Sequence, residues 1–174
     1  MRLLSALLLL LLFAVPVAHA QDARIQEIRD RYYGVTENTE AEGFYQFQVV
    51  NNPDARDYPA VGIYRQEFTL TYTLHENQLP VPHLVVMKDQ TAAFQTRIEV
   101  LLDDDGMPMF LYYDYGEGSK RVYYNAEGDC IRYLQDGEST GCERRGEFEE
   151  GEADMIRHAQ AVAKLLEVIS LGGG

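Results

Sequence analysis

The chain has 174 residues, of which 46% are hydrophobic, 11% aromatic and 25% charged. This composition excludes an intrinsically disordered chain and a collagen-like repeat, and the length suits one domain. The formal net charge of −13 argues against nucleic acid as a partner, because such a partner brings its own negative phosphates. An acidic surface with only three lysines also fits a high-salt habitat or a basic protein partner, although plain solubility is the simplest reason for it.

Residues 1–20 have the pattern of an export signal. One arginine is followed by an unbroken apolar run and by the small-residue end Ala18-His19-Ala20. We therefore predict cleavage after Ala20 and a single domain over residues 21–174. No later stretch is apolar for the ~18 to 20 residues that a membrane-spanning helix needs. We expect a product without a membrane span, soluble in the periplasm or outside the cell.

The first mature segment predicts a short amphipathic helix over residues 23–33. Ile25, Ile28 and Tyr32 recur at helical spacing, and Gly34 is a typical stop, so the helix should pack on a sheet. Strands are predicted further along the chain, from alternating or apolar runs bounded by turn residues. The predicted strands cover residues 44–50, 62–74 and 83–87, and Pro80 and Pro82 break the chain before the last of them.

From Phe94 onward the sequence predicts an antiparallel meander. Apolar and polar residues alternate, and glycines at positions 106, 116, 128 and 137 mark tight turns. Pairing the strands across these turns keeps one face apolar throughout. The predicted pairs are Val100 with Met109, Ile98 with Leu111, Leu111 with Val122, Met109 with Tyr124, and Val122 with Ile131.

The two cysteines, Cys130 and Cys142, are predicted to form a disulfide. They lie symmetrically about the turn at Asp136, as partners on neighbouring strands would, and an exported protein meets an oxidising compartment. A catalytic or metal-binding pair is the alternative, but the spacing is not Cys-x-x-Cys and no histidine lies nearby.

Residues 149–171 predict a long helix whose apolar stripe covers the apolar face of the sheet. The stripe comprises Ile156, Ala159, Val162, Ala163, Leu166 and Ile169. Acidic residues open the helix and three glycines follow it. The predicted fold is therefore α+β: a curved antiparallel β-meander of about seven strands packed on a long C-terminal helix, with a short N-terminal helix.

The hairpin from Val122 to Tyr133, followed by Asp136-Gly137-Glu138 and the C-terminal helix, carries a family resemblance. It resembles exported bacterial proteins of unknown function, in which Tyr-(Phe/Tyr)-x-x-x-Gly-x-x-Ile-Arg-aromatic precedes a terminal helix, and it is similar to membrane-occupation-type repeat hairpins. The resemblance covers about residues 94–170, with Tyr133 in the last aromatic place and the cysteine pair as an addition. It implies the fold and export, and no activity.

The sequence predicts no catalytic, cofactor-binding or metal-binding residues. His75 lacks the second histidine of a zinc-peptidase helix, and His83 and His158 stand alone. Ser119 lacks the Gly-x-Ser-x-Gly form of a nucleophile elbow. The three aspartates before Gly106 lack the glutamate that closes a calcium loop, so a solvated turn is the better interpretation.

The second face of the meander is the candidate binding surface, because it gathers arginines and aromatic residues in an otherwise acidic protein. Its residues are Arg97, Phe110, Tyr112, Arg121, Tyr123 and Arg132. The same residues could simply pair across strands and stiffen an exposed sheet. We expect a non-catalytic binding module for an envelope protein or ligand of unknown identity. An inhibitor of a basic enzyme or a carrier of a small apolar ligand is the alternative, and a hydrolase ranks last.

Overall fold

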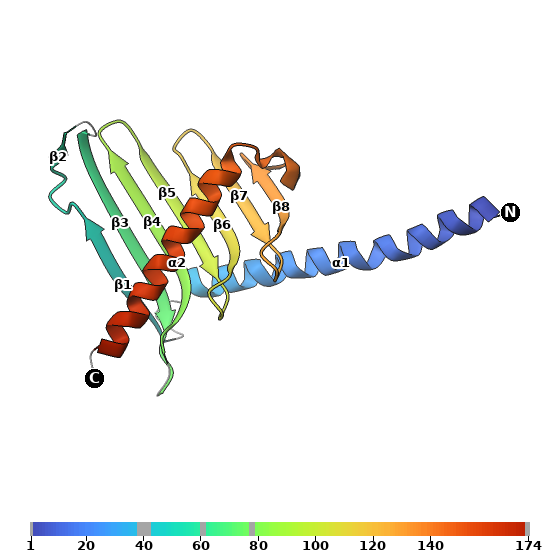
Figure 1. Cartoon of the computed structure of the whole chain (residues 1–174), viewed down its shortest axis with the longest axis horizontal. Coiled ribbons are helices and arrows are strands. Elements are labelled where there is room, and N and C mark those ends of the chain that lie inside the picture. The colour runs from blue at the N-terminus through green and yellow to red at the C-terminus, as the bar shows by residue number, and fades with distance from the viewer. Residues whose placement is uncertain (1, 38–42, 60–61, 77–78, 173–174) are drawn as a thin grey trace.

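One antiparallel sheet lies between two helices that cover its opposite faces (Figure 1). The computed structural model describes residues 2–37, 43–59, 62–76 and 79–172. The helices are α1 (Arg2–Glu37), the short 3-10 helix η1 (Cys142–Arg145) and α2 (Phe148–Gly172). The strands are β1 (Phe44–Asn51), β2 (Asp57–Tyr58), β3 (Gly62–Thr73), β4 (Val81–Thr91), β5 (Gln95–Leu102), β6 (Pro108–Asp114), β7 (Ser119–Tyr124), β8 (Cys130–Gln135) and β9 (Glu138–Ser139).

The strand order is β1-β3-β4-β5-β6-β7-β8-β9, and β2 pairs with the start of β3. Within the described residues, seven strands have six or more residues, while β2 and β9 have two each. The predicted α+β architecture is confirmed. No helix in the described part of the chain combines the length and the hydropathy that crossing a membrane requires.

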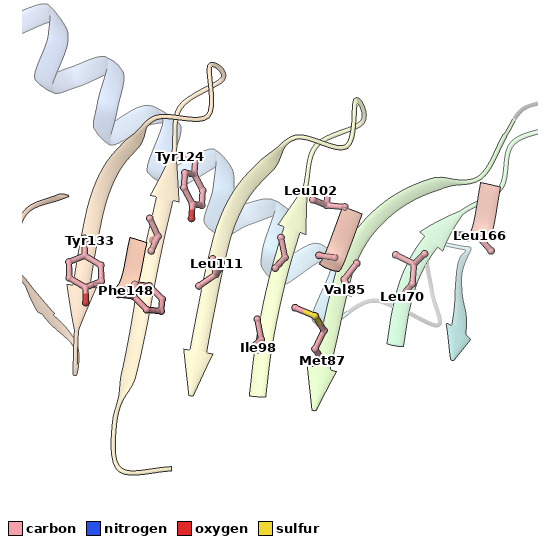
Figure 2. Packing of buried hydrophobic residues seen from close by; sticks show 13 residues of the cluster. Leu70, Val85, Met87, Ile98, Leu102, Leu111, Tyr124, Tyr133, Phe148 and Leu166 are labelled. Carbon is pink, nitrogen blue, oxygen red and sulfur yellow. The ribbon is translucent and has the colours of Figure 1, made fainter. Parts of the chain in front are cut away.

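The first core lies between the sheet and α2 (Figure 2). Val85, Val100, Leu111 and Val122 of four successive strands are fully buried on this face, as period-two alternation predicts. On α2 the matching residues include Ala159 and Leu166, with Ile156, Val162 and Ala163 partly buried against them. Ile169 is an exception, because it is 51% exposed at the end of α2. The predicted C-terminal helix and its cover of the apolar face are confirmed, but the stripe ends at Leu166.

The second core lies between the opposite face of the sheet and α1. Ile25, Ile28 and Val35 of α1 are buried there against strand residues that include Leu101 and Phe110. The helix does not stop at Gly34 as predicted but continues to Glu37. The additional residues place the side chain of Val35 against the sheet, where it is buried. The second face is therefore not simply exposed.

The register of the meander differs from the prediction at two hairpins. Val100 lies opposite Leu111 rather than Met109, because a bulge follows Leu101. Likewise Val122 lies opposite Tyr133 rather than Ile131, with a second bulge beside Tyr123. The predicted pair of Leu111 with Val122 is confirmed.

The remaining predicted pairs fail for the same reason, and the bulged residues change face. Ile98 lies opposite Tyr113, and Met109 is not paired with Tyr124, which packs in the core beneath α2. Met109 packs in the α1 core, and Ile131 packs against the same core. A bulge opposes two residues to one, so it moves one side chain across the sheet and leaves the later alternation unchanged.

The turns beside these bulges have the same form. The amide of Gly106 donates to the carbonyl of Asp103, and the amide of Gly128 donates to the carbonyl of Asn125. Both glycines have φ near +80°, a conformation that favours glycine. In each turn a side-chain oxygen of the first residue, Asp103 or Asn125, accepts a backbone N–H. Hydrogen bonds within residues 103–107 thus stabilise the turn that contains the three aspartates.

The predictions for Pro82 and Phe94 are also corrected. Pro82 does not precede β4 but lies within it, opposite Tyr72, where the register shifts. Proline is tolerated there because a bulge does not need its missing N–H. The meander was predicted to begin at Phe94, but Phe94 is exposed in the turn before β5, which begins at Gln95.

Cys130 and Cys142 form a disulfide with a Cα–Cα distance of 6.0 Å. The bond does not join two neighbouring strands as predicted. Cys142 lies in η1, because the return strand β9 is only two residues long. The disulfide therefore links η1, and with it the start of α2, to the first residue of β8.

We expect the intact mass of the unreduced protein to lie two hydrogen masses below that of the reduced protein. Closing a loop of this length stabilises the folded state by about 3 kcal/mol in the chain-entropy model. Reduction should therefore lower the urea midpoint. Two free thiols in protein purified from its natural compartment would contradict this prediction.

Candidate functional site

A groove of about 620 Å³ runs between α1 and strands β6 and β7. Its volume lies within the range of ligand-binding clefts, about 300 to 1,000 Å³. Four of the six residues of the predicted binding surface line it, and α1 supplies the other side. The strand residues are Phe110, Tyr112, Arg121 and Tyr123, and the principal helix residues are Arg29, Tyr32 and Tyr33.

The groove follows from two periodicities in the sequence. On β6 and β7, Tyr112 lies opposite Arg121 and Phe110 lies opposite Tyr123, so all four side chains share one face. On α1, the residues at positions 25, 28, 32 and 35 turn toward the sheet. Arg29 and Tyr33 are four residues apart, so they lie on one side of the helix, above the strip of sheet that α1 leaves uncovered.

Aromatic rings form the floor. The rings of Tyr32 and Phe110 meet edge to face with centroids 5.5 Å apart, and those of Phe110 and Tyr123 are 4.9 Å apart. Phe110 is 7% exposed and Tyr123 is 6% exposed. These two residues were predicted to lie on an open surface, and that prediction is wrong because α1 packs over them. They support the groove from below.

The charge of the groove is opposite to that of the protein. Among the described residues that line it, the charged ones are Arg29 and Arg121, and both are exposed. The guanidinium of Arg121 lies over the ring of Tyr112, 5.6 Å from its centroid, a favourable cation–π geometry. The ion pairs within the described chain include neither arginine. Both guanidinium groups therefore remain available to an anion.

The other two predicted surface residues lie beside the groove. Arg97 lines a second hollow of about 500 Å³, where its strand neighbours are Lys88 and Asp114. Arg132 is half-buried opposite Tyr123. The structure thus brings four of the predicted residues together and sets Arg97 and Arg132 at the periphery.

A buried carboxylate, Glu99, anchors the wall of the groove. It lies opposite Tyr112, is only 2% exposed, and accepts hydrogen bonds from the hydroxyl of Tyr32 and from Nε of Arg97. Burial, and then the hydrogen bond to Glu99, raise the pKa of Tyr32 far above its usual value. The phenol therefore stays protonated and donates, which ties α1 to the sheet.

Sequence reasoning missed Arg29, Tyr32, Tyr33 and Glu99 as site residues. The helical spacing of Arg29 and Tyr33 would have identified the helix residues. These two residues lie next to the apolar stripe of the helix, which packs on the sheet, so they must lie at the border between helix and sheet. Glu99 carried no such signal, because a glutamate between Ile98 and Val100 looks like an ordinary outward-facing strand residue.

His83 lies where α1 meets β3 and β4, and its ring is already hydrogen-bonded to neighbouring side chains. Its ring nitrogens contact Nη2 of Arg31 at 3.0 Å and Oγ1 of Thr73 at 2.9 Å. Arg31 also pairs with Asp104 in the turn before β6. Burial lowers the pKa of His83, and the neighbouring Arg31 lowers it further. These contacts favour a structural role for His83.

A second buried polar cluster lies on the opposite face, at the start of α2. Glu152 accepts hydrogen bonds from the hydroxyl of Tyr124 at 2.8 Å and from Nη1 of Arg145 at 2.6 Å. Arg145 also donates to Glu149 and to the carbonyl of Cys142. Glu152 was predicted only as one of several acidic residues near the positive end of the helix. The cluster instead locks η1, α2 and β7 together.

No protein-family model, curated protein or solved structure matches the chain.

Proposed function

We propose that the protein is an exported, non-catalytic binding module that holds an anionic ligand with a flat apolar part in the groove between α1 and the sheet. One observation carries this proposal: two exposed arginines, which form no ion pair with any described residue, flank an aromatic floor in a protein of net charge −13. The ligand is either a small molecule or a side chain of an envelope protein.

The chemistry of the lining supports this ligand class. Arginine presents a planar set of donors that matches a carboxylate or phosphate, and it binds such groups in a bidentate manner. The rings of Tyr112 and Tyr33 offer apolar area for the rest of the ligand. Because the net negative charge of the protein repels anions, the two arginines, unpaired within the described chain, make the groove a surface that attracts them.

The alternative of an apolar-ligand carrier, with its cargo between the sheet and the C-terminal helix, has less support. That space is filled by the first core, where Val100, Leu111 and Ala159 are fully buried. Inhibition of a basic enzyme by the acidic surface remains a prediction, and the groove gives no reason to favour it.

Export is part of the proposal, with residues 1–20 as the signal. Two contacts between α1 and the sheet lie just after the expected cleavage site: the Gln21 side chain donates to the carbonyl of Ile131, and Arg24 donates to that of Tyr124. The preceding part of α1 runs out beyond β8 (Figure 1). Cleavage after Ala20 would therefore leave the groove intact. The resemblance to exported bacterial proteins agrees with this proposal.

Replacing Tyr112 and Arg121 together with alanine is expected to weaken ligand binding at least about 30-fold, because truncating anchor residues of this kind costs about 2 kcal/mol or more. Stability should fall by only about 0.2 to 1 kcal/mol, the value of a solvent-facing cross-strand pair. The measurement is a thermal-shift titration with aromatic carboxylates and phosphates, supported by a pull-down from envelope extract.

The matched control is the double variant Tyr45→Ala/Arg56→Ala, which removes an exposed tyrosine and an exposed arginine elsewhere. It should bind as the wild type does. Retained binding in the Tyr112→Ala/Arg121→Ala variant would refute the groove as the site. A melting temperature many degrees lower would show that the two side chains serve the fold.

A further inference from the structure

The two edges of the sheet are built differently. At one end the two-residue strand β9, η1 and the disulfide shorten and cover the edge. At the other end β1 presents eight residues, pairs with β3 without a bulge, and contains no proline. Natural proteins usually protect such an edge with a charge, a proline or a bulge, because its free N–H and C=O groups can pair with another strand. In β1 none of these devices is present.

The charge pattern points to the same edge. Residues 44–51 read FYQFQVVN and carry no charged side chain, although a quarter of the chain is charged. After Lys164, the described part of α2 carries one charged residue, Glu167. Two copies of a protein with net charge −13 repel each other over most of their surfaces. They repel least where these two segments, one uncharged and one with a single charge, lie.

The end of α2 adds an apolar surface beside β1. Figure 1 shows α2 crossing the sheet diagonally and ending at the β1 edge. Leu166 is the last residue of its stripe that the sheet buries, while Val168, Ile169 and Leu171 are all more than half exposed. Tyr45 of β1 is also half exposed. The amphipathic stripe therefore continues for one turn beyond the sheet that it covers.

We propose that β1 is a homodimer interface, at which β1 pairs antiparallel with β1 of a second copy. An antiparallel pair of identical strands is self-complementary about a two-fold axis, so one surface serves both subunits and the assembly closes. With the axis perpendicular to the sheet, both α2 helices lie on the same face. The exposed last turn of each α2, residues 168–171, then covers β1 of the other copy, which buries Ile169.

The interface is small, so the dimer is expected to be weak. β1 and the last turn of α2, residues 168–171, supply about a dozen residues from each subunit. This is roughly half of the 20 to 30 residues that each partner supplies to a standard stable interface. We expect a dissociation constant between about 1 µM and 1 mM. Sedimentation equilibrium of the purified protein up to about 1 mM should show the average mass rising from monomer to dimer, and no higher.

The test variant is Ile169→Glu, which places a charge at the interface on a side chain that the monomer leaves exposed. It should raise the dissociation constant at least about tenfold without changing the melting temperature of the dilute monomer. Phe94→Glu is the matched control, because it adds the same charge at another exposed apolar residue, in the turn before β5. The control should dimerise as the wild type does.

Hydrogen exchange supplies an independent measurement. Amides of β1 should exchange more slowly as protein concentration rises, while amides of β8 should not respond. A monomer at every concentration overturns the proposal, as does a dimer that Ile169→Glu leaves intact. A dimer whose β1 amides exchange at the same rate at all concentrations also overturns it.

Discussion

Leu166→Asp is expected to unfold the domain or to lower its free energy of unfolding by about 5 kcal/mol or more. Leu166 is 5% exposed and packs in the core between α2 and the sheet (Figure 2). Removing a buried leucine side chain costs about 2 to 5 kcal/mol, and an unpaired carboxylate in its place adds a desolvation cost. Domains of this size are stable by only about 5 to 15 kcal/mol.

Leu165→Asp is the matched control, because Leu165 precedes Leu166 on the same helix and is 42% exposed. Both variants introduce the same charge into the same turn, so they differ in burial alone. Urea denaturation of dilute protein should give a much lower midpoint for Leu166→Asp and a nearly unchanged one for Leu165→Asp. Equal midpoints would mean that α2 does not cover the sheet in solution.

The faces of the meander could be predicted from the sequence because strand alternation has a fixed period. Val100, Leu111 and Val122 were assigned to one face from their parity, and all three are fully buried in one core. The C-terminal helix was equally predictable, since its stripe repeats over several turns and its acidic start marks the first one.

The register could not be predicted, because it depends on the bulges and not on alternation. Pairing across each turn without a bulge is the simplest rule, and it places Val100 opposite Met109. The bulge after Leu101 costs little, since the turn already needs a glycine with positive φ. Hydrophobic pattern alone does not distinguish the two registers, because both set apolar residues against each other.

The main error was to treat the second face of the meander as exposed, although the sequence held a signal that it is covered. The run Met109 to Tyr113 in β6 is apolar or aromatic at every position, which is typical of a strand buried on both faces. Its even-numbered residues therefore needed a cover. The amphipathic N-terminal helix was the element available to cover them. Because α1 packs on this face, the arginine and tyrosine residues line a groove and not a flat surface.

Arg145→Met is expected to destabilise the protein by about 3 to 5 kcal/mol at neutral pH, because it leaves the carboxylate of Glu152 buried without its cation. Glu152 is 4% exposed, and burial raises its pKa, while Tyr124 and Arg145 oppose the rise. Removing Arg145 should raise this pKa further. Arg144→Met is the matched control, because Arg144 is the exposed neighbour in η1.

The pH dependence follows from the direction of that shift. A carboxyl group whose pKa is higher in the folded state binds its proton more tightly there, so stability falls as pH rises through the folded pKa. In Arg145→Met this fall should be steeper and should reach higher pH than in the wild type, starting near the ordinary glutamate pKa of about 4.3. The penalty of the variant should therefore shrink as the solution is acidified.

Adding Glu152→Gln to Arg145→Met isolates the responsible group. The glutamine fills the same space and keeps an acceptor for the hydroxyl of Tyr124, but it carries no titrating proton. The double variant should lose the extra pH dependence and recover part of the stability at neutral pH, as measured by urea denaturation across a pH series. A penalty in Arg145→Met that is the same at all pH values would show that lost packing, and not a stranded carboxylate, causes it.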